Sequence, residues 1–152
     1  MMSPFRRWAP VIIWAAVIFT FSTHWFTSDN TAEIAEPFLH WLFPNLTPDG
    51  IGFIHHIIRK CGHLTEYFIF GLLVLRAIRA GRRDMRLVWA LATIGVVAAY
   101  ASSDEFHQSF VPGRSASIYD VMLDTTGGAL SQVAAALFAL IRRRHENQES
   151  NG

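Results

Sequence analysis

This chain has little charge and almost no cysteine. Asp, Glu, Lys and Arg make up 16% of its 152 residues, against roughly 25% in ordinary soluble domains. The single cysteine, Cys61, excludes an intrachain disulfide. A net charge of +1 gives no reason to expect a nucleic-acid partner. There is no phosphate-binding glycine loop, nucleophile elbow or dinucleotide fingerprint, so the common enzyme signatures are missing.

Apolar residues, at 51% of the chain, gather in four segments. The segments run from Trp8 to about Phe26, from about Ile57 to Ile78, from Leu87 to about Ser102 and from Val121 to Ile141. A helix needs about 20 apolar residues to cross a bilayer, with about 17 as the lower limit. The first and fourth segments meet this length plainly, whereas the second contains His63 and Glu66 and the third is short. The sequence predicts an all-α integral membrane bundle of four transmembrane helices.

Basic residues predict the orientation of this bundle. They precede the first segment, separate the second from the third and follow the fourth: Arg6, Arg7, Arg76, Arg79, Arg82, Arg83, Arg86 and Arg142 to Arg144. These regions share one side of a four-span chain, which the positive-inside rule makes cytoplasmic. We therefore expect a multi-pass protein of the cell (inner or cytoplasmic) membrane, in contact with membrane lipids, with both termini in the cytoplasm. Residues 1–144 form the expected single domain, and 145–152 form a disordered cytoplasmic tail.

Two outer loops remain, roughly Thr27 to His56 and Asp104 to Asp120. In the first, the stretch Ala32 to Phe43 mixes large apolar residues with Glu33 and Glu36. This pattern predicts an amphipathic helix lying in the membrane interface. A helix that caps the bundle is the alternative.

Polar residues recur at helical spacing on three of the segments, and such groups at membrane depth are functional candidates. Those on the second segment are Arg59, Lys60, His63, Glu66 and Tyr67, of which Arg59, His63 and Glu66 follow i, i+4, i+7 spacing. Those at the end of the third are Tyr100, Asp104, Glu105, His107 and Gln108. On the fourth, one face carries Asp120, Asp124, Gly127 and Ser131, and its small residues allow close helix approach. If these faces point inward, they meet near the outer interface.

The residue types suggest acid–base chemistry and anion binding. The candidate acid–base residues are His63, Glu66, Asp104 and Glu105. Arginine and lysine bind phosphate or carboxylate, so the candidate ligand-binding residues are Arg59, Lys60, Tyr67, His107, Gln108, Arg114, Asp120 and Asp124. His63-x-x-Glu66 and Glu105-x-His107 have spacings that metal sites can use. Without further ligand repeats we assign no metal ligand, and the cofactor is unknown.

Structural interpretations compete with these roles. Arg59 and Lys60 can extend toward lipid headgroups. Asp104 can be a water-exposed residue at a helix end, and Asp120 can be a helix N-cap. Arg114 paired with Asp104 or Asp120 would lock the bundle together.

Several of these stretches resemble the signatures of VanZ-like membrane proteins. RKCGHLTEYF, from Arg59 to Phe68, is similar to the first signature, and SDEFHQSFVPGR, from Ser103 to Arg114, is similar to the second. Asp120, Asp124 and the Gly127-Gly128 pair resemble the third, and Phe21-Ser22 resembles the apolar-Ser exit of the first span. The family motif maps onto Lys60, His63, Glu66, Tyr67, Asp104, Glu105, Gln108, Arg114, Asp120 and Asp124, whereas Arg59 and His107 come from helix geometry.

The resemblance implies a small helical membrane protein of the cell envelope. The family takes its name from a member that raises resistance to the glycopeptide teicoplanin, an antibiotic. The first expected function is an outward-facing polar pocket that binds or modifies an anionic envelope component, a lipid or cell-wall precursor headgroup. One alternative is a non-enzymatic membrane scaffold or permeation protein whose polar residues form structural ion pairs. A metal-dependent membrane hydrolase is the other alternative.

Overall fold

The computed structural model describes residues 3–22, 37, 39, 41–43, 47–82, 84–111 and 116–149. This part of the chain contains no strand and forms four long helices, which are α1 (Pro4–Phe21), α3 (Pro48–Arg79), α4 (Leu87–Gln108) and α5 (Ile118–Glu149). The expected all-helical architecture is confirmed.

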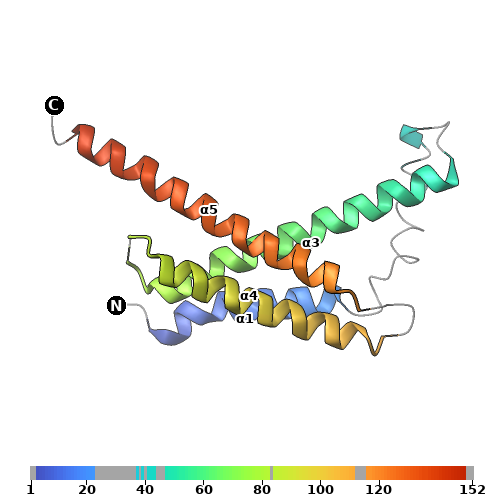
Figure 1. The fold of residues 1–152 in the computed structure, drawn as a ribbon, viewed down its shortest axis with the longest axis horizontal. Helices are drawn as coiled ribbons and strands as arrows, with labels where there is room; N and C mark the ends of the chain where they lie inside the picture. The colour runs from blue at the N-terminus through green and yellow to red at the C-terminus, as the bar shows by residue number, and fades with distance from the viewer. Residues whose placement is uncertain are drawn as a thin grey trace.

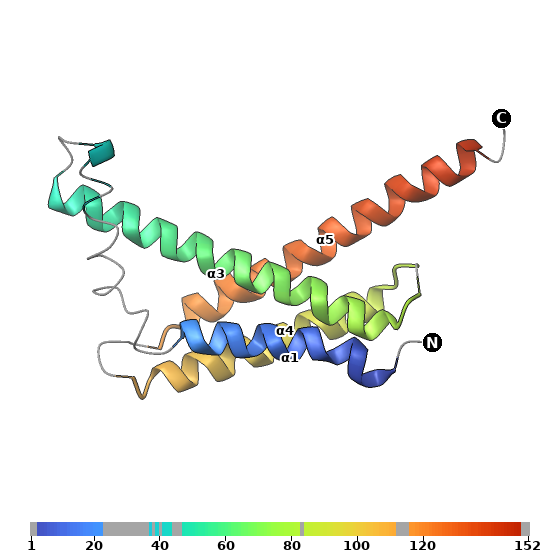
Figure 2. The ribbon, with the colours of Figure 1, turned by 180° about the vertical axis from the view of Figure 1, so that it is seen from behind.

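The helices pack around a crossing of α3 and α5, which share the most extensive interface (Figure 1). α4 packs against both of them, and α1 packs against α3 (Figure 2). The start of α1, the α3–α4 turn and the end of α5 lie on one side of the molecule, whereas α4 ends and α5 begins on the other (Figure 1). The core at the crossing includes Tyr67, Val74, Val97 and Ala101, all fully buried.

Three helices are long and apolar enough to cross a membrane: α3, α4 and α5 as far as Gln148. They support a membrane protein. The second and third segments, the weaker ones by sequence, therefore qualify as whole helices. Within the described residues, α1 does not qualify as a membrane span. It includes Arg6 and Arg7, and its apolar part, Trp8–Phe21, is shorter than about 17 residues. The fourth span stays a prediction.

Local signals explain where the helices begin and end. Ser3 caps α1 by accepting a hydrogen bond from the Arg6 amide at 3.4 Å. Thr47 caps α3 in the same way, accepting from the Gly50 amide at 3.3 Å, and Pro48 occupies the first helical position. α3 ends at Arg79, and the next residue, Ala80, is left-handed with φ 53° and turns the chain toward α4.

The helices run further than the apolar segments. The expected outer loops are therefore shorter: residues 48–56 belong to α3, and residues 104–108 belong to α4. α4 continues because the polar side chains of its last turns are buried among partners in the bundle. α5 continues through Glu149, so residues 145–149 of the expected tail are helical, supported by the Arg142–Glu146 ion pair at 2.9 Å. The expected interfacial helix lies mostly outside the described residues and stays a prediction.

Candidate functional site

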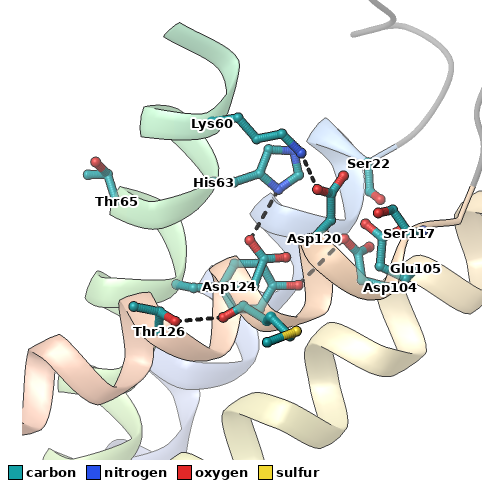
Figure 3. A network of polar contacts seen from close by, with 12 residues as sticks. Ser22, Lys60, His63, Thr65, Asp104, Glu105, Ser117, Asp120, Asp124 and Thr126 are labelled. Atoms are coloured by element: carbon teal, nitrogen blue, oxygen red, sulfur yellow. Dashed lines mark hydrogen bonds and ion pairs between the residues drawn. The ribbon is translucent and has the colours of Figure 1, made fainter. Parts of the chain in front are cut away.

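Side chains from three helices meet beside the crossing (Figure 3). α3 contributes Lys60 and His63, α4 contributes Asp104 and Glu105, and α5 contributes Asp120 and Asp124. We use the name polar cluster for these six residues together with Tyr67, Gln108 and Ser22. The acids of the cluster come from the last turns of α4 and the first turns of α5. These helix ends lie opposite the start of α1, the α3–α4 turn and the end of α5 (Figure 1). We call the latter the arginine-rich side, because most of the chain's arginines fall in or next to those three regions.

Two ion pairs join α3 to α5 in the polar cluster. The Lys60 ammonium donates to Asp120 Oδ1. One turn deeper, His63 Nδ1 lies 3.4 Å from Asp124 Oδ1, within ion-pair distance but without hydrogen-bond geometry. The side chains of Lys60 and Asp120 are 23% and 16% exposed, and those of His63 and Asp124 are 19% and 0% exposed. Three of the four groups are therefore partly exposed, and Asp124 alone among them is fully enclosed.

Gln108 ties α4 to α1 and holds one acid of the polar cluster. Its Nε2 donates to Ser22 Oγ at 2.8 Å and to Asp104 Oδ2 at 2.9 Å. The hydroxyl of Tyr67 donates to the same Asp104 oxygen at 3.5 Å. Asp104 thereby connects α4 with both α1 and α3, and all four residues are buried.

The buried carboxyl groups keep unused hydrogen-bonding capacity. Glu105 Oε2 accepts from the Ser117 amide at 2.8 Å, which ties the end of α4 to the start of α5. Glu105 Oε1, Asp104 Oδ1 and both oxygens of Asp124 are buried and have no hydrogen-bond partner. Buried polar atoms nearly always have partners in native proteins, so these oxygens mark a place for a proton, a water or a ligand group.

Small residues bring the helices close enough for these contacts. A Cβ atom built on Gly127 would lie 2.5 Å from the Leu64 carbonyl oxygen of α3. One built on Gly128 would lie 2.7 Å from Val97 Cγ1 of α4. Ser131, fully buried, lies against Gly71. The two glycines thus seat α5 directly on α3 and α4, as small residues do in membrane bundles.

The family profile described as VanZ/LLP1 matches residues 7–140, which include the whole polar cluster. The chain belongs to the VanZ/LLP1 family. No curated protein and no solved structure was found that matches it.

On α3 of this VanZ/LLP1 protein, the contacts to the other helices of the polar cluster come from Lys60, His63 and Tyr67, at i, i+3 and i+7. All three belong to the polar set that the sequence predicts for this helix. Arg59 and Glu66 are half-buried, and the Glu66 carbonyl accepts a hydrogen bond from Trp14 Nε1 at 2.9 Å. Tyr67, the third of the contact residues, is fully buried.

His107, one of the predicted ligand-binding residues, packs against Phe19 of α1, with ring centroids 4.6 Å apart and the rings tilted by 39°. Arg114 lies outside the described residues, and so does any lock that it forms with Asp104 or Asp120.

The competing structural interpretations of two acids are wrong. Asp104 is 4% exposed and is not a water-exposed helix end. Asp120 is inside the first turn of α5, where its amide donates to the Ser117 carbonyl at 3.0 Å, and its side chain pairs with Lys60 rather than capping the helix.

Sequence reasoning did not select Ser22 or Ser117 as site residues. The Phe21-Ser22 resemblance to the family exit pointed to the first of them. Nothing in the sequence pointed to Ser117, because its backbone amide makes the contact.

A metal centre has no geometric support in the described helices. No group of three or more His, Cys, Asp or Glu side chains there is arranged to hold a metal ion. Glu105 and His107, the second candidate pair, point to different partners, Ser117 and Phe19.

Proposed function

We propose that this VanZ/LLP1 protein spans the cell (inner or cytoplasmic) membrane with four helices and both termini in the cytoplasm. The polar cluster then faces outward, and it binds or modifies the headgroup of an anionic envelope component, a lipid or cell-wall precursor. The arginine-rich side opposite the cluster supports this orientation through the positive-inside rule.

The observation that carries the proposal is a partly exposed cation beside buried carboxyl groups. Lys60, whose side chain is 23% exposed, contacts Asp120 at the rim. His63 and the carboxyl groups of Asp104 and Asp124 lie behind it. A phosphate or carboxylate that reaches Lys60 replaces Asp120 as its partner, and Arg59 precedes Lys60 on the same helix.

The deeper groups of the cluster add acid–base chemistry, which a site that only binds a ligand does not require. His63, Asp104 and Glu105 are acids and bases that can move protons once a headgroup is bound at Lys60. Glu66, three residues beyond His63 on α3, is a fourth candidate beside the cluster. The unpartnered oxygens of Asp104 and Glu105 leave room for such a transfer. A link to teicoplanin resistance belongs to this proposal through the family name, and whole-cell sensitivity to teicoplanin is its physiological measurement.

Opposite substitutions at the Lys60–Asp120 pair test the binding proposal. We expect Lys60→Gln to weaken binding of a polyprenyl phosphate to the purified full chain. We expect Asp120→Asn to strengthen it, because the competing carboxylate is gone. Each substitution is nearly isosteric, and native mass spectrometry of the protein in neutral detergent measures the bound lipid. Unchanged binding in K60Q, or weaker binding in D120N, would refute the proposal.

A scaffold function is the second candidate, and the two ion pairs between α3 and α5 favour it. In a scaffold, K60Q and D120N both lower the melting temperature, and the double variant recovers part of the loss because no unpaired charge remains. Phosphate-lipid binding is then the same in all three variants. The metal-dependent hydrolase has no comparable observation in its favour.

A further inference from the structure

A second site lies on the arginine-rich side, away from the polar cluster. A cavity of about 240 Å³ opens there between the end of α3 and the second half of α5. Four arginines line it: Arg76 and Arg79 of α3, Arg82 of the following turn and Arg142 of α5. The described residues that line it include no carboxylate.

Three of the four arginines of this cavity, Arg79, Arg82 and Arg142, are held by their surroundings. Arg79 Nε donates to the Arg82 carbonyl at 3.1 Å, which fixes the turn after α3. The Arg82 guanidinium lies over the Trp89 ring, 5.8 Å from its centroid. Arg142 Nε donates to Glu146 at 2.9 Å on the exposed side of α5. Guanidinium groups held in this way lose less freedom when they bind a phosphate in bidentate fashion.

One wall of the cavity is apolar. Ala135, Phe138 and Ala139 of α5 line it, and the Phe138 side chain is 70% exposed. A small soluble anion gains no binding energy from this apolar wall, whereas an acyl chain can pack against it. α5 is also one of the helices that are apolar enough to lie in a membrane.

We propose that this cavity binds the headgroup of an anionic phospholipid, with the phosphate among Arg76, Arg79, Arg82 and Arg142 and an acyl chain along Phe138. Basic pockets between membrane helices on the cytoplasmic side have this chemistry. The site is independent of the function proposed for the polar cluster, since the two share no residue.

Two matched pairs of substitutions distinguish specific lipid binding in the cavity from general electrostatic attraction of anionic lipid to a basic surface. R76Q/R142Q removes two lining arginines, both exposed, so folding is not threatened. R143Q/R144Q removes the same charge from the same end of α5, at exposed residues that do not line the cavity. We expect R76Q/R142Q to weaken phosphatidylglycerol binding about thirtyfold, or about fivefold for each arginine. The control pair changes it by less than about threefold, because it leaves the cavity intact.

The measurement is native mass spectrometry of the full chain in neutral detergent, titrated with phosphatidylglycerol. Phosphatidylcholine with the same acyl chains tests the headgroup, and glycerol phosphate tests whether a soluble anion suffices. The proposal expects phosphatidylglycerol to bind best. Equal binding of phosphatidylcholine, equal binding of glycerol phosphate, or equal losses in the two double variants would each overturn it.

Two further variants locate the lipid. Ala139→Trp fills the cavity without changing its charge, so we expect it to release the lipid, and retention of the lipid in folded A139W would contradict the cavity as its seat. If A139W does not fold, the arginine pairs decide the question. K60Q separates the two proposals: lipid kept in K60Q but lost in R76Q/R142Q belongs to the arginine cavity. Lipid lost in K60Q but kept in R76Q/R142Q overturns the cavity proposal.

Discussion

Gly127 controls how closely α5 approaches α3, and replacing it by alanine should open the crossing. The new Cβ would lie 2.5 Å from the Leu64 carbonyl oxygen and 3.2 Å from the Phe68 amide nitrogen. Both atoms belong to the backbone of a helix, so neither can move without the whole of α3. The only relief is separation of the two helices.

The expected loss follows from two opposing terms. Overpacking a tight contact costs about 1–3 kcal/mol, and the better helix propensity of alanine returns roughly 0.5–1 kcal/mol. We expect G127A to lower the free energy of unfolding by about 1–2 kcal/mol, since the contact is to rigid backbone. For a chain of this size that corresponds to a fall in melting temperature of about 2–8 °C.

Gly62 provides the matched control. It lies in α3, and a Cβ built on it meets nothing within 4 Å. G62A should therefore leave the melting temperature unchanged or raise it slightly through helix propensity. Thermal unfolding of both variants in the same detergent, followed by circular dichroism, gives the comparison. If G127A is as stable as G62A, the close approach of α5 to α3 is not as described.

A double-mutant cycle extends this test to the polar cluster. Gly127 lies one turn beyond Asp124, so opening the crossing should also loosen the pair between Lys60 and Asp120. K60Q should then cost less stability in the G127A background than in the wild type. Equal costs in the two backgrounds would mean that the crossing does not hold the ion pair together.

Three further substitutions probe the buried contacts by their effect on the melting temperature. Gln108→Leu removes two hydrogen bonds and leaves Asp104 with less support, so it should cost about 2–3 kcal/mol, and a neutral result would contradict the bonds. Tyr67→Phe keeps the buried ring and loses a hydrogen bond at the limit of length, so its cost should be about 1 kcal/mol or less, and a larger loss would give the hydroxyl a greater role. Gly128→Ala presses on the methyl groups of Val97, so adding Val97→Ala should restore part of the lost stability; no recovery would place the strain elsewhere.

The sequence predicted the helix faces of α4 and α5 but misplaced the end of α4. Asp104 and Gln108 are four residues apart and share a face, as their hydrogen bond requires, and Asp120, Asp124 and Gly127 all face α3. From the sequence alone, the acids at the end of α4 are assigned to an outer loop, because polar residues are treated as exposed to water. These acids are buried because neighbouring segments supply hydrogen-bond partners for them. The sequence of α4 alone cannot predict partners that lie elsewhere in the chain.

The sequence was less informative about α3 and α1. Ionisable residues line both possible faces of α3, so its spacing alone could not choose between Arg59 and Lys60 as the inward cation. The choice depends on Asp120, which lies sixty residues further along the chain. In α1, the described helix covers Trp8 to Phe21 of the predicted span and begins before it, at Pro4. The rest of that span, to about Phe26, lies outside the described residues, so a membrane crossing by this segment stays a prediction.

The charge balance of the polar cluster limits what it can bind. Four carboxyl groups, those of Asp104, Glu105, Asp120 and Asp124, lie near one lysine and one histidine. An anion that enters such a site meets repulsion from every ionised acid, so it gains only where a carboxylate gives up its cation or carries a proton. Asp120 is the one acid that is both at the rim and paired with lysine. Its removal should therefore help an anion more than removal of any deeper acid, and this order of effects separates an anion site from a set of structural ion pairs.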